Sequence, residues 1–137
     1  MKITADTNLL LRTVLQDDPP RSREADALLA QAAAIAVPPT VFCEFAWVSR
    51  RGYGYSNDEI AHGITAICNV EAVATDGAAV DLGLAMLRAG GDFADGVIAH
   101  QGRTLGGGAF ASFDRAAVTM LKGGGVEAEE PVDLLVD

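Results

Sequence analysis

Two aspartates lie three residues apart at what reads as the start of a helix. Residues 90–100 have the sequence GGDFADGVIAH, so Asp92 and Asp95 follow a pair of glycines. Asp92 is well placed to cap this helix by accepting hydrogen bonds from backbone N–H groups. Asp95 suits the reciprocal position of a capping box and the positive end of the helix dipole. The alternative interpretation is that these carboxylates hold a cation.

Two more aspartates each follow a predicted strand. Asp6 ends the strand in MKITAD and Asp114 ends the strand in GGGAFASFD, and each stands directly before a predicted helix. The carboxyl ends of parallel strands share one edge of a sheet, where ligands and reacting groups gather. Either aspartate alone is explained as an N-cap. The occurrence of both at the same predicted edge favours a shared site.

Glu44 has an unexpected position in the predicted helix VFCEFAWVSRR. Its neighbours three and four residues away are mainly large and apolar, Trp47 and Val48 among them, so we expect Glu44 to project from a buried face. A buried carboxylate is costly unless it is protonated, hydrogen-bonded or matched with a positive charge. An ion pair with Arg12 or Arg50 is one explanation, and a metal ion is the other.

Asp6, Glu44, Asp95 and Asp114 come from four separate predicted elements. Right-handed βαβ connections would allow them to converge at one edge of a sheet. Carboxylates that close together raise one another's pKa unless a divalent cation neutralises them. Because all the candidate ligands are oxygens, the expected ion is Mg²⁺ or Mn²⁺ rather than Zn²⁺. A site of this kind is suited to phosphodiester hydrolysis.

The elements that would position these acids alternate between strand and helix. This alternation predicts an α/β fold, with a three-layer α/β/α arrangement around a central, mainly parallel sheet of four or five strands. The helix start at Ser56 is the clearest, because Glu59 completes a capping-box pattern. The predicted strands are a short buried one in MKITAD, then IAV, NVEAVA, the strand in GGGAFASFD, and a possible last strand DLLVD.

The chain has 137 residues, which is the size of one domain, and we expect a domain at 1–126 followed by an acidic tail at 127–137. The net charge of −9, taken as a sum, argues against a nucleic-acid partner. However, five of the 19 acids lie in the tail and four belong to the candidate site, and the rest equal the 10 Lys and Arg in number. The tail acids are Glu127, Glu129, Glu130, Asp133 and Asp137.

No apolar run approaches the roughly 18 residues that cross a bilayer, and the N-terminus lacks the apolar stretch of a signal peptide. We therefore expect a cytoplasmic protein with no membrane partner. Cys43 and Cys68 stand among apolar residues, which predicts reduced cysteines that pack as small hydrophobic groups.

Four motifs resemble, in order and spacing, the successive motifs of PIN-domain ribonucleases. They are ADTNLLLR, the glutamate of VFCEFAWV, DFADGVIA and ASFDRAA. The similarity is greatest to the VapC-type toxins of bacterial toxin–antitoxin pairs, and it covers Lys2 to about Val126. The resemblance implies that Asp6, Glu44, Asp95 and Asp114 are the catalytic, metal-binding acids.

The same resemblance assigns auxiliary residues. Asn8 is expected to help orient Asp6, and Asp92 to act as a further ligand, a helix cap, or both. Ser112 stands where the family often has Thr, whose hydroxyl holds a water or a phosphate. Gly96 and His100 depart from the family pattern, in which these positions are more usually aliphatic or small.

The implied activity is Mg²⁺- or Mn²⁺-dependent cleavage of RNA. Arg12 and Arg115 are candidates for contacts with the RNA backbone, as are Arg50, Arg51 and Arg103. The implied partners are a VapB-type antitoxin, whose basic segment would enter the acidic pocket, and a second copy of the chain.

The predicted helix carries three aromatic residues, Phe42, Phe45 and Trp47, which are too many for one inward-facing stripe. We therefore expect some of them in the core and the others against a partner.

Two other functions stay open. One is a catalytically idle module whose acidic pocket docks a basic peptide. The other is a haloacid-dehalogenase-like phosphatase, which is disfavoured because Asn8 stands where that chemistry needs a second aspartate.

Overall fold

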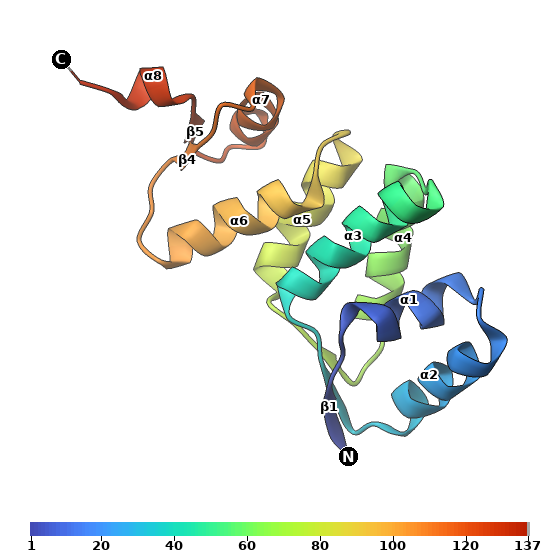
Figure 1. Ribbon diagram of the computed structural model, residues 1–137. Coiled ribbons are helices and arrows are strands. Elements are labelled where there is room, and N and C mark those ends of the chain that lie inside the picture. The colour runs from blue at the N-terminus through green and yellow to red at the C-terminus, as the bar shows by residue number, and fades with distance from the viewer. Residues whose placement is uncertain (137) are drawn as a thin grey trace. The chain divides into compact units, whose positions relative to one another are not determined.

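A computed structural model describes residues 1–136 and shows two compact units, Met1–Asp76 and Gly77–Asp137 (Figure 1). Each unit contains a parallel sheet and several helices. Asp137, counted above among the tail acids, lies outside the described residues. Within residues 1–136, no helix has the length and apolar character needed to span a membrane.

The N-terminal unit has three parallel strands in the order β1-β2-β3. The strands are β1 (Lys2–Thr4), β2 (Ala34–Ala36) and β3 (Val73–Ala74). Its helices are α1 (Thr7–Leu15), α2 (Pro19–Gln31), α3 (Pro39–Tyr53) and α4 (Asn57–Cys68). The strand register pairs Ile3 with Ile35 and Ile35 with Val73.

Local sequence signals account for most of these helix boundaries. Asp6 caps α1. The predicted capping box of α4 is confirmed, because Ser56 Oγ accepts from the Glu59 N–H and Glu59 Oε1 accepts from the Ser56 N–H, each at 3.1 Å. Gly54 ends α3 with a φ of 69°, a left-handed conformation that a glycine adopts without strain.

The core of the N-terminal unit is formed by one face of α3 and the helices and strand around it. Phe42 and Phe45 are almost completely buried, as are Ile35 and Ile64. A Cβ on Gly63 of α4 would lie 3.3 Å from Phe45 Cζ, so α3 and α4 pack closely side by side (Figure 1). The expectation that some aromatic residues of α3 belong to the core is therefore confirmed.

The C-terminal unit begins with a helical pair and ends with a two-stranded sheet. Its helices are α5 (Gly77–Arg88), α6 (Phe93–Thr104), α7 (Arg115–Gly123) and α8 (Pro131–Leu134). Its strands are β4 (Phe110–Ala111) and β5 (Ala128–Glu129), which pair in parallel. The predicted acidic tail thus contributes β5, where Ala128 is buried in a cluster with Val118 and Leu121.

Glycines allow α5 and α6 to approach closely. A Cβ on Gly96 would lie 2.5 Å from the Leu82 carbonyl oxygen, and a Cβ on Gly83 would lie 2.6 Å from the Phe93 ring. Both are closer than nonbonded atoms approach. Gly96, which departs from the family pattern, is therefore required by the contact of α6 with the α5 backbone.

In residues 1–136 the expected parallel arrangement is confirmed, and the five strands are divided between the two units. The five strands are parallel, but they form a three-stranded and a two-stranded sheet. Each strand has only two or three residues. Strands this short have too little alternating pattern for the sequence to specify their partners.

Three finer expectations about strands are wrong. β1 is mostly exposed rather than buried, because it lies at the edge of its sheet and only Ile3 is half-buried. Only the last two residues of NVEAVA form a strand. Asp133 and Leu134 of DLLVD belong to the short helix α8, since Pro131 favours a helix start.

Cys43 and Cys68 are not joined by a disulfide and are half-buried rather than in the core.

Candidate metal-binding acids

Asp6 lies between the first strand and the first helix, as expected. Its side chain is exposed, and Oδ1 accepts a hydrogen bond of 2.9 Å from the Leu9 N–H. This bond fixes the carboxylate at the N-terminus of α1, where the helix dipole favours negative charge. The second oxygen of the Asp6 carboxylate is not required by the cap.

Glu44 lies on the outward face of α3, so the expectation that it projects from a buried face is wrong. The buried residues of α3 include Phe42, Phe45, Ala46 and Ser49, which share one face at helical spacing. Glu44 is about half a turn away from that face and is exposed. The apolar neighbours of Glu44 in sequence had suggested burial, but Trp47 and Val48 are not in the core.

A hydroxyl group connects Glu44 with the segment that carries Asp6. Thr7 Oγ1 donates a hydrogen bond of 2.7 Å to Glu44 Oε2. Thr7 follows Asp6 directly in the chain, so the two predicted acids are held through adjacent residues. Neither Arg12 nor Arg50 pairs with Glu44 in the part of the chain that the structure describes.

Asn8 shares an open hollow with Asp6. The hollow has a volume of about 450 Å³ and lies between α1 and α2. Arg12, Arg21 and Glu24 also line it, together with apolar side chains, so its surface is mixed in polarity. Asn8 is therefore near Asp6, as the family resemblance implies, although its role in orienting Asp6 stays a prediction.

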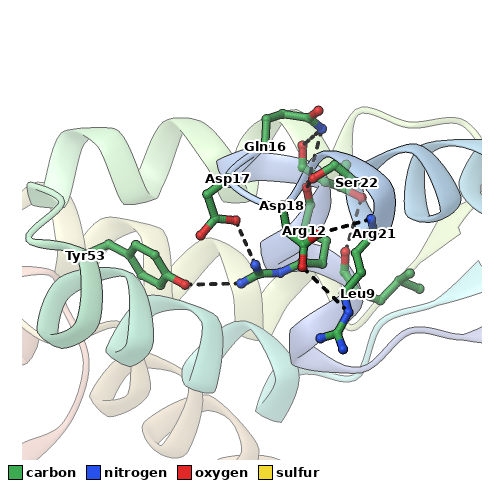
Figure 2. Close-up of polar contacts among 9 residues, drawn as sticks. Leu9, Arg12, Gln16, Asp17, Asp18, Arg21, Ser22 and Tyr53 are labelled. Carbon is green, nitrogen blue, oxygen red and sulfur yellow. Dashed lines mark hydrogen bonds and ion pairs between the residues drawn. The ribbon is translucent and has the colours of Figure 1, made fainter.

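Arg12 is held by two partners rather than presented to solvent. Its guanidinium donates to Asp17 Oδ1 at 2.8 Å and to the Tyr53 hydroxyl at 3.2 Å (Figure 2). The Tyr53 hydrogen bond, opposed by burial and reinforced by Asp17, raises the pKa of Arg12 above its ordinary range. Arg12 thus ties α1 to the end of α3, which makes it a structural group in this unit.

Three aspartates lie close enough to interact in the C-terminal unit. Asp92 caps α6 by accepting from the Ala94 N–H at 3.1 Å, and Asp114 caps α7 by accepting from the Ala117 N–H at 3.1 Å. Asp95 is half-buried in the first turn of α6. Burial, and then the charges of Asp92 and Asp114, raise the pKa of Asp95 above its ordinary 3.8.

Two residues near Asp114, Ser112 and Arg115, also form polar contacts. Ser112 Oγ accepts a hydrogen bond of 3.0 Å from the Asp114 N–H, which shapes the turn before α7. Arg115 Nε lies 3.1 Å from Glu130 Oε1, and its side chain is 85% exposed. An exposed ion pair of this kind is weak, so Arg115 can exchange Glu130 for another anion.

The structure therefore brings the predicted acids together in two sets. Asp6 is linked to Glu44 through Thr7 in the N-terminal unit. In the C-terminal unit, the charges of Asp92 and Asp114 raise the pKa of Asp95. Across residues 1–136, no three His, Cys, Asp or Glu side chains converge closely enough to form a metal site. The donor chemistry nevertheless suits a hard divalent cation, because carboxylate oxygens crowd Asp95.

Thr7 is the residue of this arrangement that we did not anticipate from the sequence. The motif ADTN contains a visible signal, a hydroxyl between Asp6 and Asn8. Its partner Glu44 is 37 residues away, and a single sequence gives no indication of so distant a hydrogen bond. Tyr53 was missed for the same reason.

A model of the PIN domain family matches residues 3–119, so the chain belongs to the PIN domain family. This membership, together with the parallel strands, confirms the three-layer α/β/α fold class. PIN domains are typically metal-dependent nucleases that act on RNA or DNA. A search of curated proteins found no match to the chain.

Proposed function

We propose that the protein is a Mg²⁺- or Mn²⁺-dependent endoribonuclease in which Asp6, Glu44, Asp95 and Asp114 bind the metal and act in catalysis. The observation that carries the proposal is the surroundings of Asp95. Burial and two neighbouring carboxylates all disfavour its negative charge. A divalent cation would relieve this repulsion, whereas a protein without such a ligand gains no stability from the arrangement.

The residues of this chain orient the acids before any substrate arrives. Backbone N–H groups at the starts of α1 and α7 hold Asp6 and Asp114, and the Thr7 hydroxyl holds Glu44. When bound, the metal supplies a polarised phosphate oxygen and a water of lowered pKa. In-line attack on the RNA phosphodiester would leave a 5′-phosphate and a 3′-hydroxyl.

The auxiliary roles of Asn8, Asp92 and Ser112 belong to the same proposal. Asp92 is a helix cap that lies close enough to influence Asp95. Arg12 and Arg115 are two of the five arginines predicted to contact RNA. Arg115 is the better placed of the two because it is exposed, whereas Arg12 is committed to Asp17 and Tyr53.

We further propose that this nuclease is a VapC-type toxin, which acts in the cytoplasm as a homodimer and is held inactive by a VapB-type antitoxin. Two hollows along α1 and α4, of about 400 and 320 Å³, support a protein partner because both are lined mainly by apolar groups. Val14, His62 and Gly63 line both of them. A basic antitoxin segment would complement the acids.

The test is cleavage of structured RNAs during a titration with Mg²⁺ or Mn²⁺, followed by sequencing of the cut ends. We expect cleavage that a chelator stops and that Asp95→Asn removes. Asp81→Asn is the matched control, since Asp81 is an exposed acid of the same unit that does not affect the Asp95 pKa.

Two outcomes would contradict the proposal. RNA that stays intact at every metal concentration would indicate an idle acidic module. Release of phosphate from small monoesters, with RNA left intact, would indicate a phosphatase.

A further inference from the structure

The outward face of α3 carries a row of exposed side chains that the metal site does not explain. Thr40, Glu44, Trp47 and Arg51 are spaced four, three and four residues apart, so they share one stripe of the helix. All four are exposed. The stripe therefore presents a carboxylate, an indole ring and a guanidinium in succession.

Trp47 is the unusual member of this stripe. Its side chain is 62% exposed, whereas Phe42 and Phe45 of the same helix are 0% and 1% exposed. The core of the unit is thus complete without the indole. One exposed apolar residue is ordinary by itself. Here, however, the ring lies one turn from Glu44, whose carboxylate is tied to Thr7 and thereby to the Asp6 segment.

Arg51 gives the stripe a positive charge at the end away from Glu44. Within residues 1–136, Arg51 has no ion-pair partner. Arg12 and Arg115, by contrast, are each paired with an acid. A guanidinium without an acidic partner is available to bind a phosphate group.

We propose that Trp47 stacks against an unpaired base of the RNA and that Arg51 binds a phosphate of the same strand. This inference rests on the proposed function, because it places the strand beside Glu44. The side chains next to Trp47 on the stripe are polar, so the face lacks the continuous apolar surface that would seat a helix of a protein partner. A ring beside a free guanidinium matches the pattern of single-strand binding.

The net charge of the protein favours a contact that does not depend on charge. A net charge of −9 opposes association with RNA, so phosphate contacts alone supply little affinity. Stacking on an aromatic ring does not depend on net charge and accepts any base. Trp47 would therefore select unpaired bases over duplex, in which the bases already stack on one another.

The experiment uses the fact that Trp47 is the only tryptophan in the chain. An unstructured RNA oligonucleotide is titrated into the full-length protein in the presence of chelator, so that no RNA is cut. We expect quenching of the tryptophan fluorescence. An abasic strand of equal length and charge, or a duplex, should leave the fluorescence nearly unchanged.

Anisotropy of labelled RNA separates the two contacts. Trp47→Ala should weaken binding about 5- to 100-fold without changing the salt dependence, and Trp47→Phe should recover most of the loss. Arg51→Ala should instead reduce the slope of log K against log salt by about 0.7, the value for one phosphate of a single strand. Leu105→Ala, which truncates an exposed apolar side chain elsewhere, should bind like the wild type.

Several results would overturn the inference. They are absence of RNA binding, binding with unchanged fluorescence, equal affinity of Trp47→Ala, or fluorescence that changes with protein concentration because a second copy covers the ring. The proposed nuclease is judged separately. Cleavage by Trp47→Ala with an unchanged KM would overturn only the stacking contact, whereas RNA bound through Trp47 but never cut would overturn only the nuclease.

Discussion

Thr7 Oγ1 and Glu44 Oε2 lie 2.7 Å apart and join the first residue of α1 to the outward face of α3. The contact positions an exposed carboxylate that would otherwise sample several rotamers, because a glutamate side chain has considerable conformational freedom. The hydrogen bond therefore contributes more to the orientation of Glu44 than to the stability of the fold.

Replacing Thr7 with Val should separate these two effects. The change removes the hydroxyl and keeps the shape, so kcat/KM for RNA should fall about tenfold, the effect of losing one hydrogen bond to a charged group. The free energy of unfolding should change by less than about 1 kcal/mol, because the bond is exposed. Thr7→Ser retains the hydroxyl and should retain activity. Equal activity of Thr7→Val and wild type would show that Glu44 needs no such support.

The close approach of α5 and α6 predicts opposite effects of alanine at two glycines of one helix. Gly96→Ala would place a methyl group 2.5 Å from the Leu82 carbonyl oxygen and should destabilise the fold by about 1–3 kcal/mol. Gly102→Ala meets no atom within 4 Å and should stabilise it by about 0.4–1 kcal/mol. Urea unfolding of both variants measures the difference. Equal stability of Gly96→Ala and Gly102→Ala would contradict the close packing of α6 against the α5 backbone.

Local rules explain what the sequence predicted well. The capping box of Ser56 and Glu59 and the caps at Asp6 and Asp114 depend on residues at most three positions apart, which a sequence displays directly. The boundaries of α3 at Pro39 and Gly54 follow from the conformational limits of proline and glycine.

Contacts between distant segments explain what the sequence did not predict. The exposure of Glu44 depends on which face of α3 meets the core, and apolar neighbours on both sides of the helix obscured that choice. Thr7 with Glu44 and Arg12 with Tyr53 join residues 37 and 41 positions apart. The division of the strands into two sheets likewise depends on pairing between distant residues, which the pattern of strands of two or three residues does not encode.

The raised pKa of Asp95 predicts a pH-dependent effect of Asp95→Asn on stability in the absence of divalent ions. The folded state keeps the proton to a higher pH than the unfolded state. Stability therefore falls as the pH rises above the ordinary aspartate pKa of 3.8, and the full penalty applies above the folded pKa. The neutral amide of the variant carries no such penalty. The variant should be more stable than wild type at neutral pH and lose this advantage below 3.8, as measured by denaturant unfolding.

Adding Mg²⁺ should reverse that order, because a ligand that binds only the folded state stabilises it. At a hundredfold excess over Kd the gain is about 2.7 kcal/mol, which appears as a rise in the thermal unfolding midpoint of the wild type. Asp95→Asn should lose most of the rise, whereas Asp81→Asn should keep it. Monovalent salt at matched ionic strength controls for screening of the net charge of −9. A rise of equal size in all three proteins would mean that the cation acts on the overall charge and that Asp95 is not its ligand.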